Sequence, residues 1–184
     1  MRLTVHRSTS STGRQKARIE QVADQAGEIV ASRLGGRLGA TQLVLTDGAG
    51  LAALGYRADL AVAGEARRSR RLRARVESQR GRTCLGLTVL NGSGTTVLVN
   101  GARHKGDLRE LDATLLHELA HAVQLSQHAA RDLKIRYLRM CFGADPDDRG
   151  LRTRYDSQLD IHEQQARNLE ALARRLPAHP GKDQ

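Results

Sequence analysis

The chain has 184 residues, of which 39% are hydrophobic and 27% charged, and 30 basic against 20 acidic residues give a net charge of +10. No apolar run approaches the roughly 20 residues that span a bilayer, and the polar, basic start of the chain excludes a secretory signal. Two cysteines without a Cys-x-x-Cys pair exclude a disulfide scaffold. We therefore expect a cytoplasmic protein without a membrane partner.

The composition divides the chain into three parts. Residues 1–14 are expected to be a flexible N-terminal lead, because the stretch from Ser8 to Gly13 is low in complexity and offers nothing to bury. Residues 15–177 are long enough to form a single domain with its own core. Residues 178–184, which follow Pro177, are expected to be a disordered tail.

The first half of this domain combines a helix, a strand and a basic segment. Apolar residues recur at three- and four-residue spacing over residues 16–34, which predicts an amphipathic helix, and residues 41–46 form a strand candidate. Residues 49–64 fit neither pattern, whereas residues 65–79 favour a charged helix. Nine arginines lie within residues 57–82. This Arg-rich patch is either a solvated helix face or a surface that attracts nucleic acid or a DNA-bound protein.

The second half begins with a predicted hairpin. Residues 84–90 and 95–100 are rich in Val, Leu and Thr and flank an Asn-Gly-Ser-Gly loop. A helix follows from Leu108 to about His128, opened by a capping box with Asp107 as the N-cap and Glu110 three residues on. Further helices are predicted over the two segments 129–141 and 156–176. The sequence thus predicts an α+β fold, with a small antiparallel or mixed sheet followed by a helical half.

The helix that begins at Leu108 carries a His-Glu-x-x-His motif. Residues i and i+4 lie on one face of a helix, so His117 and His121 can bind the same metal ion. Glu118 can then reach a water molecule at the metal and act as general base. The alternative is two surface histidines on an amphipathic helix, with Glu118 paired to an arginine. The apolar residues around the motif favour a metal site.

A catalytic zinc ion usually has three protein ligands, and the last predicted helix offers candidates for the third. His162 and Glu163 both fall close to its apolar stripe, and helical periodicity alone slightly favours His162. Glu170 is a weaker candidate, more typical of a structural or surface carboxylate. Asp160 is a candidate to orient a ligand from behind, and Tyr155 or His162 to stabilise an oxyanion.

The chain resembles the ImmA/IrrE-type metallopeptidases, a family of small intracellular gluzincin-like zincins. The shared features are a strand (residues 95–100), the motif helix, and a later helix that begins Glu-x-x-Ala at Glu163 and ends in Leu-Pro at residues 176–177. The chain departs from the family pattern in the Ala-Val-Gln that follows His121 and in the long separation before Glu163.

The resemblance implies a zinc ion (Zn²⁺) held by His117, His121 and Glu163, with Glu118 as the base. It also implies an extended substrate paired with the edge of a strand upstream of the motif helix. The implied activity is hydrolysis of peptide bonds in a protein substrate, such as a DNA-bound transcriptional repressor or regulator.

Two classes of function therefore follow. The first is a zinc metalloendopeptidase, including one that processes a secreted or phage-structural partner. The second is a zinc-stabilised, non-catalytic regulatory or nucleic-acid-binding module that uses the Arg-rich patch. The substitution Glu118→Gln separates them, since only the peptidase would lose its activity.

Overall fold

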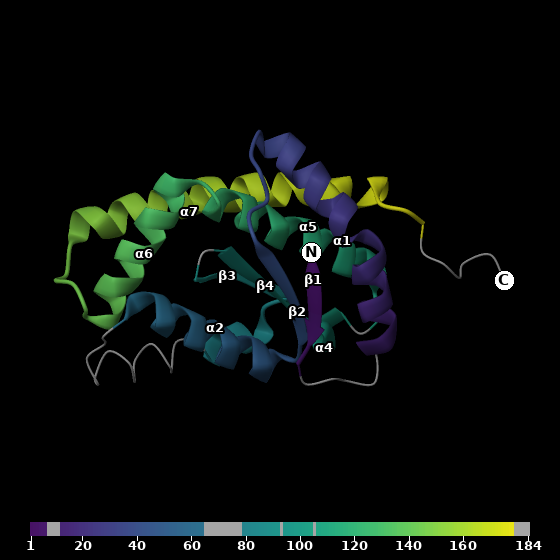
Figure 1. The fold of residues 1–184 in the computed structure, drawn as a ribbon, viewed down its shortest axis with the longest axis horizontal. Helices are drawn as coiled ribbons and strands as arrows, with labels where there is room; N and C mark the ends of the chain where they lie inside the picture. The colour runs from purple at the N-terminus through teal and green to yellow at the C-terminus, as the bar shows by residue number, and fades with distance from the viewer. Residues whose placement is uncertain (7–11, 65–78, 93, 105, 179–184) are drawn as a thin grey trace.

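Four strands form one mixed sheet in the computed structural model, which describes residues 1–6, 12–64, 79–92, 94–104 and 106–178. The strands lie in the order β1-β2-β4-β3. They are β1 (Arg2–Val5), β2 (Thr41–Thr46), β3 (Gly86–Asn91) and β4 (Gly94–Asn100). In this order β1, β2 and β4 run parallel to one another, and β3 pairs antiparallel with β4 at one edge of the sheet. The fold is α+β with a small mixed sheet, as the sequence predicts (Figure 1).

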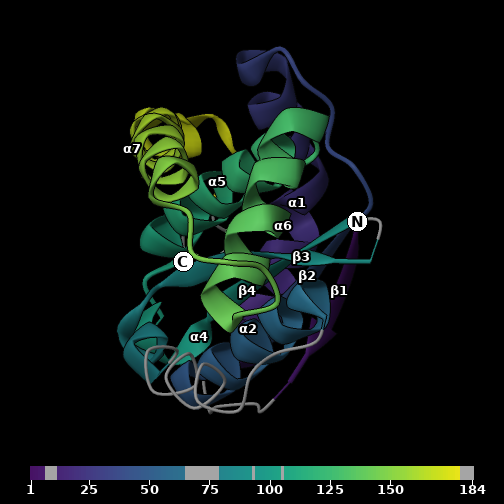
Figure 2. The ribbon, with the colours of Figure 1, turned by 90° about the vertical axis from the view of Figure 1, so that its left-hand side faces the viewer.

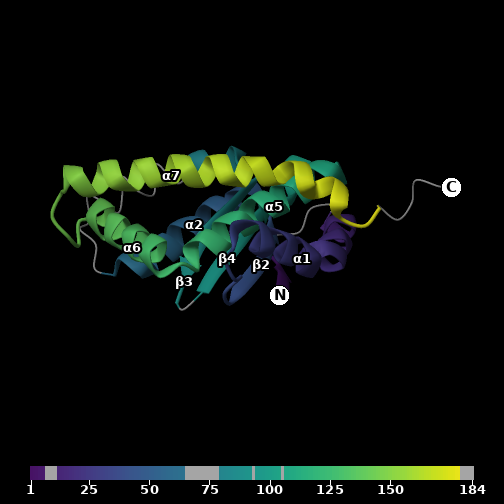
Figure 3. The ribbon, with the colours of Figure 1, turned by 90° about the horizontal axis from the view of Figure 1, so that it is seen from above.

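The helices cover both faces of this sheet. They are α1 (Thr12–Leu34), α2 (Gly48–Ala63), α4 (Gly101–His104), α5 (Leu108–Leu125), α6 (His128–Phe142) and α7 (Arg149–Glu170), with short 3-10 turns η1 (Gln79–Thr83) and η2 (Ala171–Arg175). Figure 2 places α2 on one side of the strands and α1, α5 and α7 on the other. In Figure 3, α7 runs along most of the molecule. None of the helices in the described segments is long and apolar enough to cross a membrane.

The main core lies between the sheet and the pair α1 and α5. Alternate residues of the strands point to this side, and Leu115, Leu116 and Leu119 of α5 are fully buried there. Replacing any of these three leucines by Ala is expected to cost about 2–5 kcal/mol. The opposite face of the sheet packs on α2, and α7 packs on the outer side of α5. The motif helix is therefore held between two layers.

The start of the chain differs from its predicted flexible lead. Residues Arg2–Val5 form β1, which pairs with β2, and the N-terminal amine forms an ion pair with Asp24 at 2.9 Å. Local composition carries no signal for this strand, because its pairing partner lies some 40 residues away in the chain. Residues 7–11 of the lead, the predicted helix over 65–78 and residues 179–184 of the tail lie outside the described residues.

Of residues 49–64, which fit neither pattern in the sequence, residues 49–63 belong to α2 and Gly64 is its C-cap. The Asp47 carboxylate caps this helix by accepting a hydrogen bond of 2.6 Å from the backbone N–H of Gly50. Leu51 is fully buried against the sheet. Packing on the sheet therefore decides this helix, despite the low helical propensity of its glycines.

Of the two halves of the predicted capping box, the structure confirms the N-cap residue. Asp107 is the N-cap of α5, and its carboxylate accepts from the backbone N–H groups of Arg109 and Glu110. The side chain of Glu110 does not close the capping box. It contacts Nδ1 of His104 at 3.1 Å, and the backbone N–H of Asp107 donates instead to the His104 carbonyl.

Candidate metal centre

The two histidines of the motif meet on the face of α5 that is turned toward α7. Their Nε2 atoms are 3.1 Å apart, and the side chains are 18% and 14% exposed for His117 and His121. Burial lowers the pKa of His121, with the neighbouring His117 charge acting in the same direction. A low pKa favours neutral imidazole, which is the form that binds metals.

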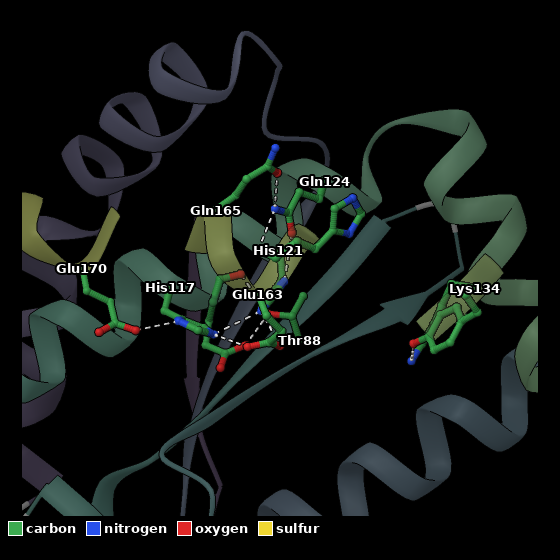
Figure 4. A network of polar contacts seen from close by, with 11 residues as sticks. Thr88, His117, His121, Gln124, Lys134, Glu163, Gln165 and Glu170 are labelled. Carbon is green, nitrogen blue, oxygen red and sulfur yellow. Dashed lines mark hydrogen bonds and ion pairs between the residues drawn. The ribbon is translucent and has the colours of Figure 1, made fainter. Parts of the chain in front are cut away.

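The carboxylate of Glu163 on α7 faces both imidazoles. Its oxygens lie 3.6 Å from Nε2 of His117 and 3.3 Å from Nε2 of His121. Ligand atoms at about 2.0–2.2 Å from a zinc ion in tetrahedral geometry are roughly 3.3–3.6 Å from one another. The two distances to Glu163, each to a different carboxylate oxygen, lie in this range, and the 3.1 Å between the two Nε2 atoms is slightly below it, so the donors are close to the spacing that one zinc ion needs. This is the one such cluster of metal-ligating side chains found among the described residues (Figure 4).

Each histidine is held from behind by a second hydrogen bond. Nδ1 of His117 is 2.8 Å from Oε1 of Glu170, and Nδ1 of His121 is 2.9 Å from Oε1 of Gln124 (Figure 4). Both partners are acceptors, so each Nδ1 carries the proton and each Nε2 offers its lone pair. The same arrangement orients the histidines in many zinc sites.

The amide of Gln124 is itself fixed in orientation. Its Nε2 donates to the carbonyl of His162 at 3.2 Å and to Oε1 of Gln165 at 3.0 Å. These two acceptors require the amide nitrogen on that side, which leaves the amide oxygen for His121. The Gln that follows the motif, a departure from the family pattern, thus has a structural reason within this fold.

Glu118 contacts β3 through its carboxylate. The hydroxyl of Thr88 lies 2.7 Å from Oε2 of Glu118 and 2.8 Å from its backbone oxygen, so its one hydrogen is shared between them. Gly86 allows this approach, because a Cβ atom there would be 2.6 Å from Cγ of Glu118. Burial raises the pKa of Glu118 to about 7, with the charge of Glu163 adding to it and the Thr88 hydrogen bond and His117 opposing it.

These residues form the wall of a cavity of about 720 Å³. One side of the cavity is β3 with the residues just before it, and the other side is formed by α5, α6 and α7. His117, Glu118, His121 and Glu163 all line this space. A molecule in the cavity would therefore reach the candidate metal site and Glu118 together.

The structure separates the residues that the sequence left open on α7. Glu163 joins the imidazoles, whereas the ring of His162 turns to Gln158, whose Nε2 is 3.2 Å from its own Nε2. Asp160 is exposed, and the carboxylate that contacts Nδ1 of His117 is that of Glu170. The three- and four-residue spacing of apolar residues cannot distinguish neighbours such as His162 and Glu163, because both lie near the same apolar stripe of the helix.

Sequence reasoning missed three of the residues described above. Thr88 and Gly86 belong to an ordinary strand pattern, and their contact with Glu118 arises only when β3 packs on α5. Gln124 could have been found, since it lies three residues after His121 on the same helix face and is a polar residue in an apolar stretch. Tyr155 lines the cavity but contacts Lys134 rather than the histidines.

The Arg-rich patch over residues 57–82 lies mostly outside the described residues. Arg57 is exposed on α2, where its Nε donates to the carbonyl of Ala53. Its part in binding nucleic acid or a DNA-bound partner stays a prediction. No protein-family model, no curated protein and no solved structure matches the chain.

Proposed function

We propose that this protein is a zinc-dependent peptidase of the zincin type, as its resemblance to the ImmA/IrrE metallopeptidases implies. The observation that carries the proposal is the convergence of three donor groups at zinc-like spacing, with both histidines oriented by acceptors at Nδ1. In this proposal His117, His121 and Glu163 hold the metal. The two-histidine surface alternative is less consistent with donors that are mostly buried in a cavity wall.

A bound zinc ion polarises a carbonyl group and lowers the pKa of a water molecule to about 7. The part of the chain itself is the proton transfer. Glu118 accepts a proton from the attacking water on its carboxylate and passes it to the leaving amine. The pKa of about 7 that burial gives this carboxyl lies in the range that suits both steps. Between the two proton transfers, the hydroxyl of Thr88 holds the Glu118 carboxylate in place.

The substrate in this proposal is a peptide segment in extended form. β3 is an edge strand of the sheet and its residues Gly86 to Thr88 line the cavity beside Glu118. An edge strand offers unpaired backbone groups, with which an extended peptide can pair. A protein substrate with an exposed segment, such as a transcriptional regulator, suits this arrangement.

Two measurements test the proposal in sequence. Elemental analysis of the purified protein is expected to give about one zinc per chain, lost in Glu163→Ala and retained in His162→Ala. Zinc-loaded protein is then incubated with a pool of random peptides, and new termini are sequenced by mass spectrometry. Cleavage by the wild type and none by Glu118→Gln is the expected result.

The opposite outcomes assign the protein to another class. Wild-type protein that holds no zinc after reconstitution would refute the metal site. Zinc without cleavage, in a protein whose binding of nucleic acid is unchanged by Glu118→Gln, would favour the zinc-stabilised binding module. Zinc lost only in His162→Ala would keep the peptidase and move the third ligand.

A further inference from the structure

The cavity continues past the candidate metal site along one face of α7. The residues of α7 that line it recur at three- and four-residue spacing: Tyr155, Gln158, Leu159, His162, Glu163 and Glu170. Tyr155 and Glu163 are eight positions apart, which is about 12 Å along a helix axis. Figure 4 shows Lys134, the partner of Tyr155, well apart from the histidines. The cavity therefore has a second polar end.

Two side chains form this second end. Nζ of Lys134, on α6, donates a hydrogen bond of 2.8 Å to the hydroxyl of Tyr155, and the Tyr155 ring stacks on Tyr137 with centroids 3.8 Å apart. An ammonium group has three N–H donors and no acceptor, and a hydroxyl that accepts a bond still has its own hydrogen to donate. Lys134 and Tyr155 both line the cavity, so they can direct N–H and O–H donors and a positive charge into it.

The counter-charge of Lys134 comes from a different direction. Asp59 on α2 acts on Lys134 through its charge, but it is not among the residues that line the cavity. Its Oδ1 is buried without a hydrogen-bond partner, so Lys134 does not donate to that atom. The acidic group thus balances part of the charge from behind and leaves the cavity side of the ammonium to a ligand.

The walls between the two ends are largely aliphatic. Leu125, Ala130, Leu133 and Leu159 line the cavity, and Gln158 and His162 of α7 add polar groups to it. A largely aliphatic passage with a cation and a hydroxyl at its end suits a group with an aliphatic stem and a negatively charged tip. A carboxylate is the charged tip that a peptide can supply, either from Asp and Glu side chains or from its C-terminus.

We propose that Lys134 and Tyr155 form a carboxylate-binding subsite that selects peptides bearing a carboxylate near the cleaved bond. The proposal rests on the proposed function for the place of that bond. An extended chain advances 3.3–3.6 Å per residue, so a separation of about 12 Å corresponds to roughly three or four residues. An acidic residue or a free C-terminus at this distance from the cut is the expected signature.

Peptide retention tests the subsite without requiring turnover. Zinc-loaded Glu118→Gln protein is mixed with two pools of random N-acetylated peptides, one with free C-termini and one amidated, and the retained peptides are sequenced. Enrichment of Asp and Glu in the amidated pool assigns the carboxylate to a side chain, and a preference for the free-terminus pool assigns it to the chain end. A charge-assisted hydrogen bond predicts a preference of about tenfold or more.

Matched variants separate the subsite from the general attraction of a protein with net charge +10 for acidic peptides. Adding Lys134→Gln is expected to abolish the preference. Adding Lys16→Gln, which removes the same charge from an exposed side chain 3.6 Å from Glu20, is expected to leave it unchanged. Tyr155→Phe removes only the hydroxyl and is expected to weaken the preference. If Lys134→Gln alone does not fold, the double variant Asp59→Asn with Lys134→Gln also removes the buried carboxylate that would otherwise lack its counter-charge.

The outcomes distinguish this proposal from the proposed activity. Retained peptides with no excess of carboxylate in either pool, or a preference that survives Lys134→Gln, overturn the subsite. Wild-type cleavage without any carboxylate preference also overturns the subsite and leaves the peptidase intact. Carboxylate-dependent retention in a protein that cleaves neither pool supports the subsite and refutes the peptidase.

Discussion

The two ends of the cavity are built from the same face of α7, but they are prepared for opposite partners. At the metal end each imidazole has a second hydrogen bond, to Glu170 or Gln124, that fixes its orientation. At the other end Lys134 donates to Tyr155 and keeps further donors for the cavity. In our proposals the first end holds its groups in a fixed orientation for a zinc ion, and the second presents charge to a substrate. The contrast between the two ends is therefore one between donors that are already oriented and donors that are still available.

The largest expected effect comes from Glu118→Gln at the metal end. General acid–base catalysis contributes typically about 10²–10⁴-fold, so the rate of peptide cleavage should fall by that factor. Zinc content should be unchanged, because the Glu118 carboxylate contacts Thr88 and is not one of the three grouped donors. Cleavage assays and elemental analysis on the same preparation check both parts. Loss of zinc in this variant would instead make Glu118 a part of the metal site.

Gly86→Ala is expected to have the next largest effect on cleavage. The new Cβ would lie 2.6 Å from Cγ of Glu118, so the carboxylate must move from its place beside Thr88. A displacement of about 1 Å at a catalytic group can lower a rate about 100-fold. Gly81→Ala is the matched control, since a Cβ there meets only Leu51 at 3.5 Å. Equal activity of the two variants would show that the place of Glu118 is not critical.

Removing the second hydrogen bonds tests the rigidity of the metal end. Glu170→Ala and Gln124→Ala should each weaken zinc binding by about 10–100-fold, as found for such outer partners. Competition with a chelating indicator measures this affinity. Asp160→Ala, on the same helix but exposed, is the control and should bind zinc as the wild type does. If Glu170→Ala and Gln124→Ala bind zinc as tightly as the wild type does, the second hydrogen bonds do not distinguish the metal end of the cavity from the other end.

The smallest expected effect is on stability at the other end. Burial raises the pKa of Asp59 above its usual value, against the opposing charge of Lys134. The unfolded chain therefore loses this proton at lower pH than the folded chain does, so ionisation favours unfolding. From pH 4 to 7 the stability of the wild type should fall relative to Asp59→Asn, with denaturant titrations as the measurement. If the stability of the wild type instead rises with pH relative to Asp59→Asn, the charge of Lys134 outweighs burial in setting the pKa of Asp59.

Much of the metal end could be predicted because its signals are local. The motif spacing places His117 and His121 on one helix face, and the N-cap at Asp107 fixes where that helix begins. Glu163 was a harder case, since periodicity favoured His162 and only the resemblance favoured Glu163. The packing of α7 on α5 brings the Glu163 carboxylate, and not the His162 ring, to the imidazoles.

The sequence by itself determined the motif helix, the hairpin beside it and the α+β class, because helical and strand periodicities and caps act within a few residues of the chain. Only the tertiary structure decided which side chains meet. The contacts of Thr88 with Glu118, of Glu170 with His117 and of Lys134 with Tyr155 join residues 30, 53 and 21 positions apart. Such contacts depend on how whole elements pack, and no local pattern of residues encodes that packing.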